Sequence, residues 1–236
     1  MNLIVLFADD FIAGSSRVRL TGRRAHHVYG IHHAQPGKQL RVGLWQGLLG
    51  RGLVTRCTPE ILEMEVTLAD KPPAPLPITL IMALPRPKVL KRVIQGVVAM
   101  GIKNMVLLKT WRVEKSYWQS PLLAEKSLNE QVLLGLEQAG DTVPPQILLR
   151  SRFKPFMEDE LPLFIAGTVP MLALPAAELN VPARGQRSIS LFIGPEGGLV
   201  AYEIEVLREV GFATVSLGPR ILRVEQAVPA LLGRLL

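Results

Sequence analysis

The sequence predicts an α/β protein with a small N-terminal β-barrel and a larger C-terminal domain built on a mostly parallel sheet. Three observations lead to this fold class. Short alternating strands with frequent turns fill residues 1–70. Strands alternate with helical segments over residues 78–236. A proline-rich stretch, residues 71–77, separates the two patterns, and prolines at that density favour a semi-rigid, extended linker.

The N-terminal domain is expected to consist mainly of short strands. Residues 38–45 and 64–69 alternate polar and apolar side chains, which is the period of a half-buried strand. Gln35-Pro36-Gly37 and Gln46-Gly47 supply turns around the first of them. Residues 23–31 are expected to form a short helix packed against the barrel.

The C-terminal domain contains further strands in apolar runs. They are expected at residues 78–84, 104–109, 146–149, 171–174, 189–193 and 213–217.

Helices are expected between these strands. Residues 86–100 place apolar side chains at helical spacing and end at Gly101. A long helix is expected to start at Ser120-Pro121 and to end at Gly140, and a shorter one to cover residues 200–210. Pro229 lies in the last helix, and proline is tolerated in a first turn, so that helix is expected to begin only after Arg223.

The charge distribution indicates a polyanionic partner. The 236 residues include 27 Lys and Arg against 20 Asp and Glu, a net charge of +7. Residues 11–56 contain no acidic residue, and Glu114 is the only one between residues 86 and 115. These blocks are either solvated faces or nucleic-acid surfaces. Ordinary surfaces mix signs, so acid-free blocks favour nucleic acid.

Other features point to a cytoplasmic location. No apolar run reaches the roughly 18 residues that span a bilayer. The first residues lack a basic region and soon meet Asp9 and Asp10, so no signal peptide is expected. Cys57 is the only cysteine, which excludes an intrachain disulfide and fits a reducing compartment. We interpret Cys57 as a small buried apolar residue.

Two glycine-rich turns near the C-terminus are candidate ligand-binding loops. Residues 194–198 and 217–223 each follow an apolar run, and ligands of open α/β sheets bind past the carboxyl ends of such strands. Turns about 24 residues apart predict one pocket built largely from main chain, so valine at Gly197 is expected to fill the ligand's space. The dinucleotide and P-loop fingerprints are absent, which disfavours a nicotinamide dehydrogenase. Glu196 favours a neutral or cationic ligand over a phosphate.

Each of these residues also has a purely structural interpretation. Gly197 and Gly198 are consistent with a tight turn into the next helix, and Glu196 with a favourable charge at a helix N-terminus. Arg223 and Glu225 are compatible with a surface ion pair, worth less than about 1 kcal/mol. The co-occurrence of both turns favours the functional interpretation.

Histidines and aromatic residues leave further alternatives. Adjacent histidines, as in His26-His27 and His32-His33, point to different sides, and no cysteine or carboxylate set accompanies them. We therefore expect no metal site, and RNA contact or barrel packing instead. Trp111, Tyr117 and Trp118 are candidates either for stacking on a flipped base or for packing in the core or a dimer.

The two turns resemble those of a known family. The sequence Ile193-Gly194-Pro195-Glu196-Gly197-Gly198, followed by Leu217-Gly218-Pro219-Arg220-Ile221-Leu222-Arg223 and Glu225, resembles the RsmE family. These are SPOUT-class methyltransferases that act on N3 of a uridine in 16S ribosomal RNA. Ala25-His26-His27, Pro36-Gly37 and Glu137-Gln138-Ala139-Gly140 also match, so the resemblance covers nearly the whole chain. The chain departs from the family pattern at Asp141, Val224, Gln226 and Pro229.

The resemblance implies a fold, a cofactor and partners. The fold would be a PUA-like barrel followed by a SPOUT domain whose C-terminus is threaded into a deep trefoil knot. The cofactor would be S-adenosylmethionine, bent within the knot. The substrate would be 16S rRNA or the small ribosomal subunit, and the enzyme would be a homodimer.

The resemblance and the chemistry together assign roles. The cofactor-binding residues would be Leu174, Pro175, Gly194, Pro195, Glu196, Gly197, Gly198, Leu217, Gly218, Ile221, Leu222 and Arg223. Uridine N3 must lose a proton, so a base or a cation that stabilises the anion is required. Glu225 is the candidate base, Arg223 the candidate cation and Glu196 the partner of the sulfonium. The sequence is equally consistent with the roles of the two glutamates exchanged. RNA contacts are expected from Arg17, Arg19, Arg23, Arg24, His26, Arg86, Lys88, Lys91 and Arg92.

Overall fold

The computed structural model describes residues 2–175, 177–182, 185 and 187–235. The chain divides into two compact units, one of residues 1–74 with 133–144 and the other of residues 75–132 with 145–236. The first change of unit, between Ala74 and Pro75, lies within the proline-rich stretch. The return of residues 133–144 to the N-terminal unit has no counterpart in the sequence pattern.

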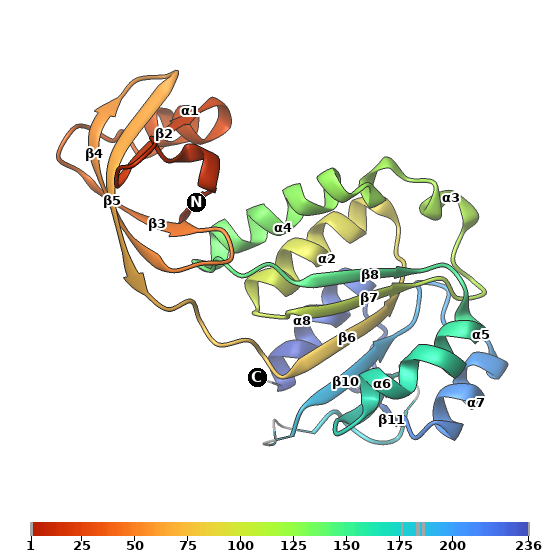
Figure 1. Cartoon of the computed structure of the whole chain (residues 1–236). Coiled ribbons are helices and arrows are strands. Elements are labelled where there is room, and N and C mark those ends of the chain that lie inside the picture. The colour runs from red at the N-terminus through yellow and green to blue at the C-terminus, as the bar shows by residue number, and fades with distance from the viewer. Residues whose placement is uncertain (1, 176, 183–184, 186, 236) are drawn as a thin grey trace. The chain divides into compact units, whose positions relative to one another are not determined.

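The N-terminal unit is built on a five-stranded mixed sheet (Figure 1). The strands lie in the order β1 (Ile4–Leu6), β3 (Gln39–Leu44), β4 (Leu49–Cys57), β5 (Ile61–Asp70) and β2 (Arg17–Thr21). β1 runs parallel to β3, and the other pairs are antiparallel. The strands expected at residues 38–45 and 64–69 are confirmed as β3 and part of β5.

Helix α1 (Gly22–Gly30) confirms the expected short helix and covers this sheet. It buries Ala25 and Val28 against strand residues such as Leu20 and Leu62. A short 3-10 turn, η1 (Ala8–Asp10), follows β1. Gly50 lies where β4 bulges, and a Cβ there would collide with the Thr67 carbonyl, so the close approach of β4 and β5 requires glycine.

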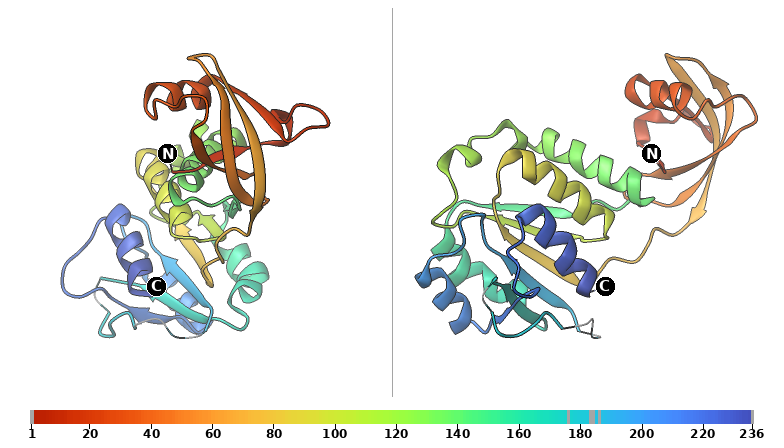
Figure 2. Two further views of the ribbon diagram at one scale, coloured as in Figure 1. Left: turned by 90° about the vertical axis from the view of Figure 1, so that its left-hand side faces the viewer. Right: turned by 180° about the vertical axis from the view of Figure 1, so that it is seen from behind.

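The C-terminal unit is built on a six-stranded sheet in which every pair is parallel, as expected. Its order is β11 (Ala213–Val215), β9 (Val169–Ala173), β10 (Ile189–Ile193), β6 (Ile78–Ala83), β7 (Asn104–Leu108) and β8 (Gln146–Arg150). Helices cover both faces, which explains why the central strands are mostly apolar (Figures 1 and 2).

One face of this sheet carries helices α2 (Pro87–Ala99) and α8 (Val224–Leu235), which pack against each other. The other face carries the short helical segments α5 (Phe153–Pro155), η3 (Phe156–Glu160), a π-helical turn, and α6 (Leu161–Ile165), together with α7 (Ala201–Glu209). Phe192 of β10 packs into that second layer and meets Phe212 edge to face at 6.1 Å.

Helices α2, α7 and α8 confirm three of the expected helices. The predicted start of the long helix, at Ser120-Pro121, was wrong. Ser120 caps the 3-10 turn η2 (Pro121–Leu123), and its side chain accepts the Leu122 amide at 3.3 Å. Ala124 is then extended, so α4 (Glu125–Ala139) begins only after it. A short helix, α3 (Lys115–Trp118), precedes this turn. Among the described residues, no helix is both long and apolar enough to cross a membrane.

The last helix begins at Val224 as expected, but the reason given for it was wrong. Pro229 is the sixth residue of α8 and lies beyond the first turn. Because proline has no N–H, the Glu225 carbonyl loses its partner within the helix. Burial of Val228, Leu231 and Leu232 compensates by fixing the helix against its neighbours.

Candidate active site

A cavity of about 570 Å³ lies at the carboxyl edge of the parallel sheet. Because all the strands run in one direction, the loops after β6, β9, β10 and β11 leave from the same edge. These four loops and the first turns of α8 form the cavity wall. The volume is in the range of cavities that bind small molecules and cofactors.

The cavity joins the two glycine turns, which confirms the expectation of one shared pocket. The expected cofactor residues that line it are Leu174, Pro175, Gly194, Pro195, Glu196, Gly198, Leu217, Gly218, Ile221, Leu222 and Arg223. Gly198 and Gly218 have φ angles of +74° and +108°, a region that side chains disfavour.

Gly197 is the exception, because it is not among the residues that line the cavity. A Cβ at this position would lie 3.4 Å from Cβ and 3.5 Å from Cδ of Arg112. The Gly197 carbonyl accepts a hydrogen bond of 2.6 Å from Nη1 of Arg112. A side chain at this position would therefore contact Arg112, and the expectation that valine here fills the ligand's space stays a prediction.

The three candidate catalytic residues, Arg223, Glu225 and Glu196, all line the cavity. The Arg223 amide donates to the Gln226 side chain at 3.3 Å, which is half of a capping box at the start of α8. In the described part of the chain, no ion pair joins Arg223 to Glu225. Both charged groups therefore face the cavity without neutralising each other in an ion pair.

Glu196 is held by the loop after β6. Its Oε1 accepts the Arg86 amide at 3.2 Å, and Nε of Arg86 lies 3.6 Å away. Arg86 is the N-cap residue of α2, so the carboxylate lies at the N-terminus of that helix and not of α7, which follows it in sequence. The structural and the ligand-binding interpretations of Glu196 are thus compatible.

Sequence reasoning missed several residues of the cavity wall. Arg86 and Lys88, expected only as RNA contacts, line the cavity, as do Arg220, Ser216 and Leu199. The signal for Arg86 was available, because it follows the buried strand β6 at the same edge as the glycine turns.

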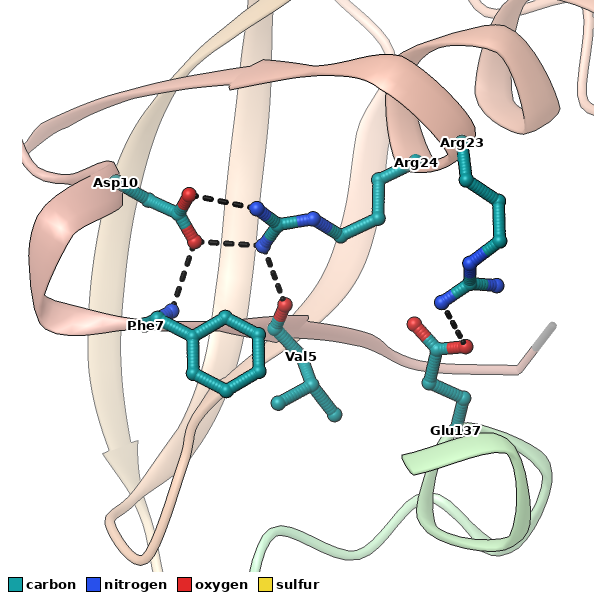
Figure 3. A network of polar contacts seen from close by, with 6 residues as sticks. All are labelled: Val5, Phe7, Asp10, Arg23, Arg24 and Glu137. Carbon is teal, nitrogen blue, oxygen red and sulfur yellow. Dashed lines mark hydrogen bonds and ion pairs between the residues drawn. The ribbon is translucent and has the colours of Figure 1, made fainter. Parts of the chain in front are cut away.

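Some basic residues of the N-terminal unit form ion pairs and hydrogen bonds within the protein, and Figure 3 shows these contacts for Arg23 and Arg24. Arg24 forms two hydrogen bonds to the Asp10 carboxylate, of 2.6 and 2.7 Å, and one of 3.0 Å to the Val5 carbonyl. Its side chain is only 18% exposed. Arg24 therefore has a structural role, which corrects its expected role in RNA contact.

Other expected RNA contacts remain accessible. Arg23 and Arg19 form ion pairs of 3.0 and 2.8 Å with Glu137 and Glu63, but their side chains are half exposed. The remaining candidates, Arg17, His26, Lys91 and Arg92, are exposed.

Three further residues have roles within the N-terminal unit. The buried Asp141 carboxylate accepts the amides of Thr142 and Val143 at 2.6 and 3.0 Å, which closes the turn after α4. Burial and nearby positive charges, including His32 and Arg23, lower the pKa of His27. Cys57 is half-buried against the sheet core, less than expected, and burial raises the pKa of its thiol. The described residues contain no group of three His, Cys, Asp or Glu side chains able to hold a metal ion.

The fold and the cavity belong to an RNA methyltransferase. The RNA methyltransferase domain family matches residues 72–236, and the chain belongs to this family. Within it, the resemblance to the RsmE family is confirmed by relatives that match more than nine-tenths of this chain. Ribosomal RNA small subunit methyltransferase E of Treponema pallidum is 26% identical over 235 residues, covering 98% of this chain and 88% of its own. The protein of the same name from Synechocystis is 27% identical over 238 residues, covering 92% and 72%.

Solved structures of similar fold contain the expected cofactor. Ribosomal RNA small subunit methyltransferase E of Neisseria gonorrhoeae, bound to S-adenosyl methionine, has a TM-score of 0.75 and 19% identity, covering 98% of this chain and 95% of its own. A putative methyltransferase of Legionella pneumophila in complex with the same cofactor has a TM-score of 0.76 and 21% identity, covering 100% and 97%.

Proposed function

We propose that this chain uses S-adenosylmethionine to methylate N3 of a uridine in 16S ribosomal RNA, in the cytoplasm. The observation that carries the proposal is the single cavity bounded by both glycine turns and by three candidate catalytic side chains. The names of the full-length relatives support the choice of small-subunit rRNA.

The residues of the cavity fit S-adenosylmethionine. Leu217, Ile221 and Leu222 provide apolar walls for an adenine, with peptide groups of the same loop nearby. Glu196 places a carboxylate on the wall, where it would stabilise a sulfonium. When bound, this cofactor supplies a methyl group on a positively charged sulfur.

We assign the catalytic roles according to whether each charged group already has an ion-pair partner. Glu196 already shares its charge with Arg86, whereas Glu225 and Arg223 have no ion-pair partner among the described residues. We therefore assign Glu225 as the base that takes the N3 proton and Arg223 as the cation that stabilises the uracil anion. S-adenosylmethionine, when bound, would supply the methyl group to the lone pair left on N3 and would leave as a neutral thioether. Holding the two reacting atoms in line supplies much of the rate.

Finer features of the fold and the partners belong to the same proposal and rest on the resemblance. The N-terminal unit would be a PUA-like RNA-binding barrel. The C-terminal unit would be a SPOUT domain with a deep trefoil knot, and the enzyme would be a homodimer. The RNA contacts would be Arg17, Arg19, Arg23, His26, Arg86, Lys88, Lys91 and Arg92, and no metal would be needed.

Two measurements test the proposal. Calorimetry with S-adenosylhomocysteine should show binding to the purified protein. Mass spectrometry of 16S rRNA nucleosides should show that 3-methyluridine disappears in a deletion strain and returns with the gene. RNA binding without cofactor binding would instead identify a non-catalytic RNA-binding or ribosome-assembly protein. Loss of a different modified nucleoside would identify a SPOUT enzyme with another RNA target.

A further inference from the structure

Trp111 is unusually exposed for a tryptophan. Its side chain is 82% exposed, whereas Trp118, in the same segment, is half-buried. Trp111 follows β7 by three residues, so it lies at the carboxyl edge of the sheet, the edge that carries the cavity. Single exposed apolar residues are common on protein surfaces, and Trp111 differs from them in how its turn is anchored.

The turn that carries Trp111 is anchored on both sides. Thr110 and Val113 are 2% and 5% exposed, and the Val113 amide donates to the Thr110 carbonyl at 3.1 Å. Trp111 is therefore at the tip of a tight turn with two buried ends. The backbone of the turn is therefore fixed, while the indole that it carries is exposed.

The same turn is tied to the segment that contains the first glycine turn. The Trp111 amide donates to Oε1 of Glu203 at 2.7 Å. Glu203 is 2% exposed, and its other oxygen accepts the Val200 amide at 3.0 Å. Next to Trp111, the Arg112 guanidinium donates to the Gly197 carbonyl at 2.6 Å. The backbone of Trp111 thus has a fixed place relative to the loop that lines the cavity.

The charges around the indole suit a polyanion. Lys109, Arg112 and Lys115 surround it in sequence, and Glu114 is the only acid among them. The Ser116 hydroxyl donates to the Glu114 carboxylate at 3.5 Å. A two-fold contact through this turn would bring its cations against their own copies, which disfavours a second chain as the occupant.

We propose that Trp111 is a platform on which a nucleobase of the substrate RNA stacks beside the cavity. The inference rests on the proposed function, because the base belongs to the RNA to be methylated. A flat, rigid aromatic face flanked by cations is the arrangement with which proteins bind single-stranded bases. Trp111 would position the RNA, while Glu203 and Arg112 hold the turn in place.

The experiment compares Trp111→Leu, which removes the ring, with Trp111→Phe, which keeps one. Affinity for a fluorescein-labelled single-stranded oligouridine is measured first, followed by KM and kcat on small ribosomal subunits from a deletion strain. Trp111→Leu should raise the Kd for oligouridine and the KM for subunits about tenfold or more. Trp111→Phe should raise both by less than about threefold, because a smaller ring still stacks. Affinity for S-adenosylhomocysteine should not change.

The control is Leu163→Ser on α6, since Leu163 is 79% exposed and lies outside the cavity wall. It should leave oligouridine binding unchanged. Wild-type affinity in Trp111→Leu would overturn the inference, and so would a change of sedimentation coefficient showing that Trp111 contacts a second chain. If subunits gain no 3-methyluridine while Trp111→Leu still weakens oligouridine binding, the proposed function fails and the stacking site stands.

Discussion

Glu196 and Arg86 join two loops of the cavity wall that are distant in sequence. The Arg86 amide donates to Oε1 of Glu196 at 3.2 Å, and the Arg86 Nε lies 3.6 Å from the same oxygen. The carboxylate is therefore fixed at the N-terminus of α2 while still bordering the cavity. A group held in this way is suited to recognising a positive charge, because its position does not depend on the ligand.

Glu196→Gln should weaken binding of the charged sulfonium of the cofactor without changing how the cavity fits the rest of the molecule. Glutamine retains an acceptor for the Arg86 amide but no negative charge. We expect the affinity for S-adenosylmethionine to fall about fivefold or more, because an ionic contact is worth about 1 kcal/mol or more at a partly buried site. The affinity for the uncharged S-adenosylhomocysteine should change much less. Equal losses for both ligands, measured by calorimetry, would contradict the sulfonium role.

Arg223→Ala and Glu225→Gln should lower turnover far more than cofactor affinity. A positioned base or anion-stabilising cation contributes about 100-fold or more to the rate. Single-turnover methylation of small subunits gives the rate, and calorimetry with S-adenosylhomocysteine gives the affinity. If either variant loses both in the same proportion, the residue binds the cofactor and has no separate part in the chemistry.

Arg112 and Gly197 should behave as one unit. Arg112→Ala removes the bond to the Gly197 carbonyl, and Gly197→Val adds a branched side chain against the same Arg112 side chain. Each variant should weaken S-adenosylhomocysteine binding about three- to tenfold, the loss of a hydrogen bond to a charged donor at an exposed site.

A double-mutant cycle checks this coupling. The double variant should lose much less than the product of the two single effects, because both changes remove the same contact. If the two losses of S-adenosylhomocysteine affinity multiply fully, valine at Gly197 affects the cavity independently of the Arg112 hydrogen bond.

RNA affinity should depend steeply on salt. Each phosphate neutralised by a cation contributes about 0.9 to the slope of log Kd against log salt on a duplex and about 0.7 on a single strand. Lys91→Ala and Arg92→Ala should each lower that slope by about one contact. Fluorescence anisotropy at several salt concentrations measures it. Arg24→Ala is the contrasting variant, because it should cost folding stability of about 2–3 kcal/mol by leaving Asp10 unpaired.

Glu137 should make the stability of the protein depend on pH. Burial raises the pKa of its carboxyl above the ordinary value of 4.5, although Arg23 acts in the opposite direction. The folded state then binds the proton more tightly than the unfolded state. The contribution of this group is complete below the unfolded pKa and is lost as the pH rises through the folded pKa. Urea unfolding from pH 4 upward should show this loss in the wild type, and Glu137→Gln should abolish it.

The parallel sheet and its cavity could be predicted because the signals are local. Apolar runs such as residues 189–193 mark buried strands, and a glycine turn after such a run marks the ligand edge. The family motifs added the cofactor and the chemistry. The same local logic failed at Ser120, where capping residues start a 3-10 turn and not the long helix.

Other features depend on contacts between distant segments, which one sequence does not display. Gly197 faces Arg112 because two separate loops meet, and no local pattern distinguishes it from Gly198. The segment 153–165 was not assigned to helices because two prolines, Pro155 and Pro162, interrupt its pattern. Strand β2 was not predicted, although its residues RVRLT alternate polar and apolar side chains at the period of a half-buried strand.

The N-terminal unit combines residues 1–74 with residues 133–144. During translation, the second stretch is made well after the first. The carbonyl of Glu137 accepts the amides of Asn2 and Leu3, and Leu133 packs against Leu3, Val5 and Leu49. A nascent chain that has emerged only as far as Ala74 lacks these partners, so the Asn2 and Leu3 amides and the cluster around Val5 gain them only when residues 133–144 follow. A fragment cut at the proline stretch would share this defect. The N-terminal folding unit of this protein therefore does not end at the proline-rich stretch, where the sequence places a linker.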